Sequence, residues 1–329
     1  MFVCVRYFTS EVGAGCKPPV MDITRRRFDR DTDLRLVQDM SHRVWRRDPR
    51  RLGFETSFGT LAWEGGGEGR GRMFERDGHV VGWARLTPGY RRIRRMGVWD
   101  AAPPSLVWLV DPDETDPSSV LEVILQWAES RSDAAFTTSH AQADEEASHY
   151  LRTRGYVPDP DEPFGIYLQQ PLHDVGDDGP TLPGYRFTTM ADLDDVEVRA
   201  ELHRRAWDGS TRSADDVRAT MSTWPYRADL DVVAVADDGS PAASALAWYD
   251  AGYGYGEFEP VGTATEHRGR GVGAATLHFG LARLRDAGAS HAVVGARGDD
   301  DYPVPRRLYR SVGFMDVGRQ VMVRRTRPS

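Results

Sequence analysis

The sequence predicts a mixed α/β fold with helices on both faces of a sheet, built from two domains of similar size. The chain has 329 residues, about twice the size of a common single domain. Strand-like and helix-like patterns alternate along both halves, which is typical of α/β architecture. Residues 171–183 contain three prolines, two glycines and three aspartates, a composition that opposes regular structure. We therefore expect a linker at this position.

The expected organisation has four parts. Residues 1–20 are expected to be a disordered extension, because Met21 begins a stretch that looks like the start of a folded domain. A first domain over residues 21–170, the linker over 171–183 and a second domain over 184–329 follow.

Hydrophobic periodicity is clearer in the second half than in the first. It predicts strands at 185–189, 231–236, 242–249, 256–263, 291–295 and 314–323, and helices at 192–207, 272–287 and 305–311. The first half repeats this order weakly, with a hairpin at 73–77 and 80–86, a strand at 106–110, and helices at 119–130 and 150–154. We interpret the two halves as a duplicated domain.

Composition restricts the class of partner. Lys and Arg total 42 and Asp and Glu total 50, which gives a net charge of −8 and argues against nucleic-acid or anionic-membrane binding. No run of about 18 apolar residues predicts a membrane helix. The only cysteines, Cys4 and Cys16, form no zinc-ligand set, and the histidines lack metal spacing. We expect a cytoplasmic protein without a bound metal.

The most informative segment joins the strand at 256–263 to the helix at 272–287. Arg268, Gly269, Gly271 and Gly273 stand where that helix begins. Unpaired amides and partial positive charge at a helix N-terminus bind phosphate, and glycines let the backbone approach the anion. The segment therefore predicts a pyrophosphate cradle, to which Arg268 or Arg270 adds a charged contact.

Two alternatives apply to this loop. Gly269-x-Gly271-x-x-Ala274 formally fits a dinucleotide fingerprint, but only about 55 residues follow it, too few for a second mononucleotide-binding unit. A glycine-rich turn that binds nothing is the other alternative.

Arg268-x-x-Gly271-x-Gly273, followed by Leu308-Tyr309-x-x-x-Gly313-Phe314, resembles the GNAT superfamily of acyl-CoA-dependent N-acyltransferases. The resemblance covers about residues 182–325. It implies two tandem GNAT-like domains, of which the second is catalytic. The arrangement, with a degenerate N-terminal copy, is similar to several actinobacterial members.

The resemblance also implies roles for individual residues. Acetyl-CoA is the implied co-substrate, with its pantetheine arm along Val261, Gly262 and Thr263 and its pyrophosphate on Arg268, Gly269, Arg270, Gly271, Val272, Gly273 and Ala274. Tyr309 matches the tyrosine that protonates the departing thiolate, and Glu257 and Glu259 fall where the family often keeps a general base. The sequence departs from the family at Tyr302 and Pro305, where Asn and Ala are frequent.

Elementary chemistry supports the same residues. An ammonium group must lose a proton before it attacks a thioester, and a general base contributes about 10²–10⁴-fold. Glu257 and Glu259 are two apart on a strand and so face the same side. Pro260 cannot donate to a neighbouring strand and predicts a bulge or splayed pair that would open a slot. Solvent-facing glutamates and a core tyrosine at 309 are the alternatives.

The first half lacks the corresponding groups. When Val110 is aligned with Thr263, Thr115 stands at the Arg268 position and Leu151 at the Tyr309 position. We expect a non-catalytic half that packs on the second and shapes its acceptor pocket. Trp207, Trp224 and Tyr226 are candidates for the pocket wall or for the core.

The expected function is transfer of an acetyl group from acetyl-CoA to a primary amine of a small molecule, by direct attack within a ternary complex. The alternatives are a protein N-acetyltransferase and a non-catalytic CoA-binding regulatory protein. The sequence identifies neither the amine nor the acyl length, and it leaves a monomer and a homodimer open.

Overall fold

The computed structural model describes residues 23–67, 70–89, 91–95, 98–132, 135–176 and 179–325, without the side chains of 91–99. The extension expected over residues 1–20 lies outside the described residues. We call the chain up to residue 171 the first half and the chain from residue 179 the second half.

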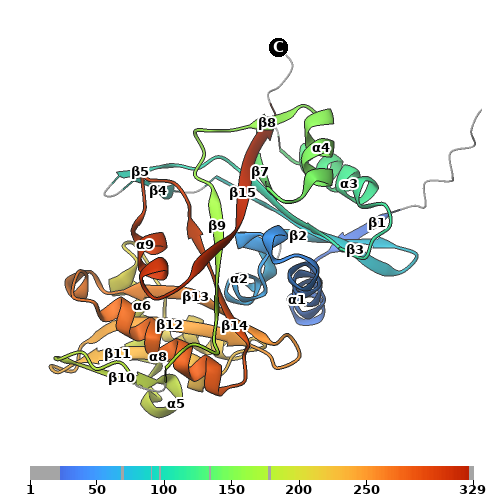
Figure 1. Cartoon of the computed structure of the whole chain (residues 1–329). Helices are drawn as coiled ribbons and strands as arrows, with labels where there is room; N and C mark the ends of the chain where they lie inside the picture. Colours follow the sequence, from blue (N-terminus) through green and yellow to red (C-terminus); the bar gives the residue numbers. More distant parts are fainter. Residues whose placement is uncertain are drawn as a thin grey trace, which may run out of the picture.

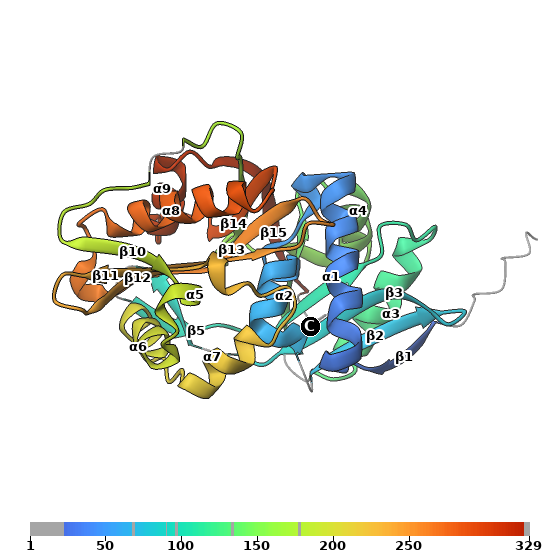
Figure 2. The ribbon, with the colours of Figure 1, turned by 90° about the horizontal axis from the view of Figure 1, so that it is seen from below.

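One mixed sheet runs through both halves (Figures 1 and 2), in the order β1-β2-β3-β6-β7-β15-β9-β14-β13-β12-β11-β10. The strands of the first half are β1 (Thr24–Arg27), β2 (Gly71–Arg76), β3 (His79–Thr87), β6 (Ser105–Val110), β7 (Thr137–Ala141), β8 (Tyr156–Pro158), which pairs with β15, and β9 (Gly165–Pro171). Those of the second half are β10 (Tyr185–Thr189), β11 (Asp231–Ala236), β12 (Pro241–Tyr249), β13 (Tyr255–Thr263), β14 (His291–Arg297) and β15 (Met315–Arg325). A separate hairpin contains β4 (Arg91–Arg95) and β5 (Val98–Ala101).

Helices cover both faces of the sheet, which confirms the predicted fold class. The first half contains α1 (Arg30–Arg47), α2 (Phe58–Glu64), α3 (Pro117–Glu129) and α4 (Glu145–Thr153). The second contains α5 (Met190–Leu193), α6 (Val196–Ala206), α7 (Ala214–Met221), α8 (Val272–Asp286) and α9 (Val304–Ser311). In the second half α8 lies on one face, whereas α6, together with α2 of the first half, packs on the other (Figure 2).

The strands predicted in the second half are found within a few residues of their expected ends. The helix expected at 192–207 is instead divided into α5 and α6. Asp194 has a positive φ of 47°, which ends α5, and the Asp195 side chain caps α6 by accepting from the amides of Glu197 and Val198. The hydrophobic periodicity of the sequence also did not predict α1, α2 and α7.

The last strand of each half lies in the other half's part of the sheet. β9 pairs with β14 over seven residue pairs, from His291–Pro171 to Arg297–Gly165. β15 pairs with β9 and then with β7 and β8. The segment over 171–183 therefore separates two stretches of sequence, but the β-sheet pairing crosses it, and Leu172 is fully buried in the core under α8.

Each half contains one parallel strand pair joined through a helix, β6-α3-β7 and β13-α8-β14. The first pair is only two residues long, at Ser105–Thr137 and Leu106–Thr138. The second runs from Tyr255–His291 to Phe258–Val294. Beyond these residues the strands diverge, so each half has an opening between its two parallel strands.

Candidate active site

The opening between β13 and β14 begins at the predicted interruption. Pairing with β14 stops at Phe258, although β13 continues to Thr263. On the other edge, the register with β12 shifts between Ala245 and Ala247, so Glu259 and Pro260 together lie opposite one residue. The bulge and splay expected from Pro260 are confirmed. They leave one edge of the β13 backbone from residue 259 onward without a partner strand.

The glycine-rich loop ends at an uncapped helix. Gly271 is the N-cap residue of α8, has a φ of 81° and offers no side chain to the helix amides. Gly269 also has a positive φ, 74°, which a residue with a Cβ adopts only at a cost of about 1–2 kcal/mol. In the part of the chain that the structure describes, the amides of residues 269–274 donate to no acceptor. Six amides at the positive end of a helix therefore remain available to an anion.

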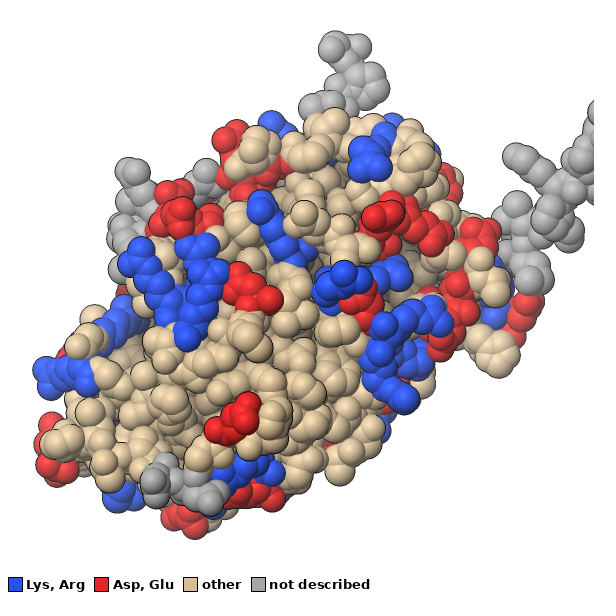
Figure 3. Space-filling view, in the orientation of Figure 1, with Lys and Arg blue, Asp and Glu red and all other residues tan. Residues whose placement is uncertain are grey.

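Arg268 holds this loop in place. Its guanidinium donates to the carbonyl of Ala206 at the end of α6 (2.7 Å) and to that of Thr263 at the end of β13 (3.2 Å). Arg270, in contrast, is exposed and has no partner among the described side chains. Figure 3 shows arginine side chains gathered over the part of the second half that carries α9 and the start of α8. Arg268 thus connects the loop to α6 and β13, whereas the side chain of Arg270 remains accessible to a ligand.

The strand predicted to hold pantetheine has tight packing at its glycine. A Cβ on Gly262 would come within 2.2 Å of the Trp207 ring, so the indole packs directly against the strand. A Cβ on Gly273 would come within 2.8 Å of the Thr263 hydroxyl oxygen. The end of β13 and the start of α8 therefore leave no room for a side chain at residue 273. Thr263 therefore lies directly beside Gly273 in the first turn of α8, which also contains Val272 and Ala274. Gly262 lies against Trp207, and Val261 packs against the same core as Ala274.

Glu257 is anchored by the first half. Its carboxylate accepts hydrogen bonds from the Ser57 hydroxyl and from the Gly59 amide (2.8 Å), and the side chain is 1% exposed. Burial raises the pKa of Glu257 to about 7, although these hydrogen bonds act in the opposite direction. Its oxygens are engaged at the junction of α2 and β13.

Glu259 has no such anchor. Its side chain is half-buried and makes no hydrogen bond or ion pair with a described residue, while its carbonyl accepts from the Trp248 indole N–H (2.6 Å). Burial raises the pKa of Glu259 to about 8, with further contributions from the charges of Glu257 and Glu64. The Glu259 backbone is thus held at the bulge, while its carboxyl group has no hydrogen-bond partner among the described residues.

Tyr309 lies on α9 and is 6% exposed. Its ring packs edge-on against Phe314, with 6.0 Å between the ring centroids. Burial raises the pKa of Tyr309 far above its usual value, and the negative charge of Glu259 adds to the shift. Glu259 on β13 is thus the charged group with the largest effect on the pKa of Tyr309.

The first half contributes side chains that the sequence did not reveal. Glu64, at the end of α2, forms an ion pair with Arg85 and raises the pKa of Glu259. Trp63 packs against His203, 5.6 Å between ring centroids, which in turn stacks on Trp207 at 4.3 Å. These groups come from residues far apart in the chain, so no local motif could have identified them.

The three aromatic candidates for the pocket wall lie in two different places. Trp207 packs against β13 at Gly262, within the site. Trp224 and Tyr226 pack instead against the core shared by the two halves. The Trp224 ring lies under the guanidinium of Arg35, 3.2 Å from its centroid, and the Tyr226 hydroxyl donates to Asp231 (3.3 Å).

Two further findings concern metals and membranes. Within the described ranges, no group of three or more His, Cys, Asp or Glu side chains is arranged to hold a metal ion. None of the described helices is long and apolar enough to cross a membrane.

Comparison with known proteins supports the motif-based resemblance. Residues 198–314 match the model of the acetyltransferase (GNAT) family. A search of curated proteins finds no match.

Among solved structures, a GCN5-related N-acetyltransferase from Sphaerobacter thermophilus is 18% identical, with a TM-score of 0.58, and the match covers 92% of this chain and 95% of that one. A tandem GNAT protein from the clavulanic acid biosynthesis pathway is 15% identical, with a TM-score of 0.59 and coverage of 92% and 98%. A GNAT-family acetyltransferase from Colwellia psychrerythraea is 10% identical, with a TM-score of 0.56 and coverage of 92% and 100%. The chain therefore has a GNAT family domain over residues 198–314 and, as a whole, the fold of a tandem GNAT protein.

Proposed function

We propose that this protein is an N-acetyltransferase that moves an acetyl group from acetyl-CoA to a primary amine of a small molecule. The observation that carries the proposal is the row of free amides over residues 269–274, next to the opening between β13 and β14. We place Glu259 and Tyr309 at this opening, because Glu259 lies at the bulge of β13 and its charge raises the pKa of Tyr309. An anion cradle, a slot beside a strand edge, a base and an acid are the parts that acyl transfer from a CoA thioester requires.

The residues present fit acetyl-CoA, which supplies an activated acetyl thioester when bound. The amides of residues 269–274 would hold the diphosphate, and Arg270 would add a charged contact. The unpaired edge of Val261–Thr263 offers backbone hydrogen bonds to the amide groups of the pantetheine arm. Arg268 keeps the loop and the strand together through the carbonyls of Ala206 and Thr263.

Glu259 is the proposed general base. Its pKa of about 8 lies near physiological pH, where a base best combines availability with basicity. Glu257 is the proposed anchor, because Ser57 and Gly59 occupy its oxygens. Of the two glutamates on this face of β13, Glu259 is thus the proposed reacting group and Glu257 the proposed positioning group.

Tyr309 is the proposed general acid. Its raised pKa keeps the phenol protonated throughout the physiological range, so a proton is available to the departing thiolate. Its carbon frame packs in the core beneath α9, which fixes the direction of the hydroxyl.

The first half is proposed to be a non-catalytic, degenerate copy that completes the acceptor site. Its helix α3 corresponds to α8, but the Asp116 side chain already accepts from the Ser119 amide (3.2 Å), which leaves no comparable cradle. Glu64 and Trp63 instead lie toward the site of the second half.

The experiment combines binding and turnover. Calorimetry with acetyl-CoA and a thiol-release assay with a broad panel of small amines are carried out on the wild type and on Tyr309→Phe, with Tyr150→Phe on α4 of the first half as the control. We expect acetyl-CoA to bind both variants, and Tyr309→Phe to lose about 10²–10⁴-fold in kcat. Absence of acetyl-CoA binding by the wild type would overturn the proposal. Binding without thiol release for any amine would favour a regulatory protein.

A further inference from the structure

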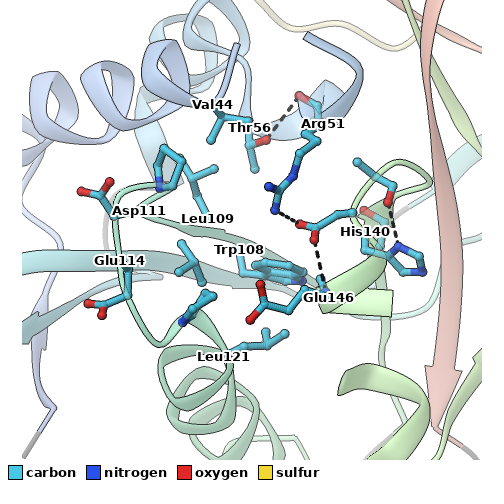
Figure 4. A pocket seen from close by; sticks show the side chains of 18 of the residues that line it. Val44, Arg51, Thr56, Trp108, Leu109, Asp111, Glu114, Leu121, His140 and Glu146 are labelled. Carbon is cyan, nitrogen blue, oxygen red and sulfur yellow. Dashed lines mark hydrogen bonds and ion pairs between the residues drawn. The ribbon is translucent and has the colours of Figure 1, made fainter. Parts of the chain in front are cut away.

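The first half contains a cavity at the position that corresponds to the acyl-CoA slot of the second half. The strands β6 and β7 diverge after the Leu106–Thr138 pair, and a cavity of about 260 Å³ lies beside the opening (Figure 4). Its walls come from the end of α1, the segment 51–56, β6, β7, and the first turns of α3 and α4. Gln320 of the exchanged strand β15 completes the lining.

The loop that borders this cavity excludes a diphosphate. Residues 112–117 read Pro-Asp-Glu-Thr-Asp-Pro, so two positions lack an amide hydrogen and three carry a carboxylate. Asp116 caps α3 with its own side chain. An acyl-CoA would bring its phosphates against these carboxylates, whereas the equivalent loop of the second half contains glycines and arginines.

The charges around the cavity leave two carboxylates uncompensated. Four acidic side chains are matched by arginines, in the pairs Asp111–Arg43 (2.5 Å), Asp113–Arg47 (2.8 Å), Glu114–Arg76 (2.6 Å) and Asp144–Arg51 (2.7 Å). Glu55 and Glu146 also line the cavity and have no ion-pair partner among the described residues. Burial raises the pKa of Glu55 to about 7, so a bound cation would stabilise its charged form, whereas Glu146 is exposed. Glu146 only accepts a hydrogen bond from the Ser118 hydroxyl (3.3 Å). The local excess of negative charge attracts a cation.

An aromatic ring forms part of the wall next to Glu146. The Trp108 indole N–H donates to the Thr138 hydroxyl (3.1 Å), which satisfies its polar edge and fixes the ring. Figure 4 shows the Glu146 side chain beside this ring, with Leu121 below it and Leu109 and Val44 across the cavity. A fixed indole with apolar neighbours accommodates an apolar or aromatic body and also attracts an ammonium group.

A histidine acceptor adds to this arrangement. His140 is 6% exposed and lines the cavity. Its Nδ1 lies 2.9 Å from the Ala141 carbonyl and therefore carries the proton, which leaves Nε2 as an acceptor without a partner in the described structure. An accessible ring nitrogen on a largely buried side chain can accept a hydrogen bond from a ligand N–H.

We propose that the cavity between β6 and β7 is a second binding site, which takes a small organic cation with an apolar or aromatic body and an ammonium group. The Trp108 face holds the body, and the carboxylates of Glu55 and Glu146 hold the charge. This site is separate from the acyl-transfer site, and occupation of one does not require the other.

The test uses three probes that share a phenyl ring and carry a positive, a neutral and a negative substituent: benzylamine, benzyl alcohol and benzoate. Each is titrated calorimetrically into the full-length protein without acetyl-CoA. We expect benzylamine to bind at least about ten times more tightly than benzyl alcohol, and benzoate not to bind, because the unmatched charge is negative.

Variants locate the bound probe. Glu55→Gln and Glu146→Gln should each weaken benzylamine binding about 3- to 10-fold. Glu145→Gln is the matched control, since Glu145 occupies the same first turn of α4 without lining the cavity, and it should leave the affinity unchanged. Because Glu146 is exposed, its variant remains informative even if Glu55→Gln fails to fold.

Three results with the wild type and the cavity variants would overturn the proposal. These are equal binding of benzylamine and benzyl alcohol, no binding of benzylamine at millimolar concentration, and unchanged affinity in both Glu55→Gln and Glu146→Gln. Loss of binding in Glu259→Gln alone would place benzylamine in the acyl-transfer site and would equally overturn the proposal.

Discussion

The Ser57 hydroxyl hydrogen-bonds to the carboxylate of Glu257, which stands 200 residues further along the chain. Both side chains are buried, and the Gly59 amide donates to the same carboxylate. This contact attaches the first turn of α2, in the first half, to the strand that carries Glu259. The geometry of the candidate active site therefore depends on a half of the protein that contributes neither the anion cradle nor Tyr309.

Removal of the Ser57 hydroxyl tests this attachment. Ser57→Ala should lower the free energy of unfolding by about 1–3 kcal/mol, because a buried carboxyl oxygen loses its donor. Denaturant unfolding followed by fluorescence measures the change. Ser222→Ala, which alters an exposed serine at the end of α7, should have little effect. Equal stability of Ser57→Ala and the wild type would show that the contact contributes nothing.

The two glutamates should respond differently to the same substitution. Glu259→Gln removes the proposed base and should reduce kcat about 10²–10⁴-fold, while acetyl-CoA affinity is retained. Glu257→Gln keeps an amide oxygen that can still accept from the Gly59 amide, so its kcat should fall much less. Steady-state kinetics with one amine measure both variants. The reverse order of effects would assign the base to Glu257.

The activity should depend on pH through Glu259. Its pKa is raised to about 8, so the carboxyl is mostly protonated at pH 7 and becomes the active carboxylate as the pH rises. With one amine throughout, kcat/KM should therefore increase through about pH 8. Glu64→Gln removes a negative charge that raises this pKa and should move the profile to lower pH. A shift to higher pH, or none, would contradict this electrostatic coupling.

Gly271 should be necessary for the anion cradle. Gly271→Ala forces a residue with a Cβ into a φ of 81°, at a cost of about 1–2 kcal/mol, although no atom obstructs the Cβ itself. Acetyl-CoA affinity should fall about 5- to 30-fold, as measured by calorimetry. Gly176→Ala, in an exposed segment with ordinary backbone geometry, is the control. Unchanged affinity would mean that the loop geometry does not set cofactor binding.

The second half should not be stable alone. A fragment over residues 182–329 lacks β9, which leaves the edge of β14 unpaired and exposes the core that Leu168 and Leu172 fill. We expect it to be insoluble or inactive, and co-expression of residues 1–181 to restore soluble protein. A soluble fragment with full activity would show that the first half supports neither the fold nor the site.

The sequence alone determined the parts of the site that depend on local chemistry. Glycines with positive φ at 269 and 271, the periodicity of α8, and Pro260 within a strand each act within a few residues, so the loop, the helix and the splay could be predicted. Tyr309 was identified because it belongs to a short motif, Leu-Tyr-x-x-x-Gly-Phe, that is typical of the family that the sequence resembles. Even here the pattern could not show that Asp194 divides the expected helix at 192–207.

Only the tertiary structure decided which groups meet. The exchange of β9 and β15, the bond between Ser57 and Glu257, and the approach of Glu64 to Glu259 join residues from the two halves of the chain. Such contacts produce no periodicity and no short motif in the sequence. The reason is that each of the two contacting segments follows only its own local helix or strand preference. The local sequence was sufficient to identify each candidate group. Its pKa and its partners, in contrast, depend on burial against residues that are far away in the chain.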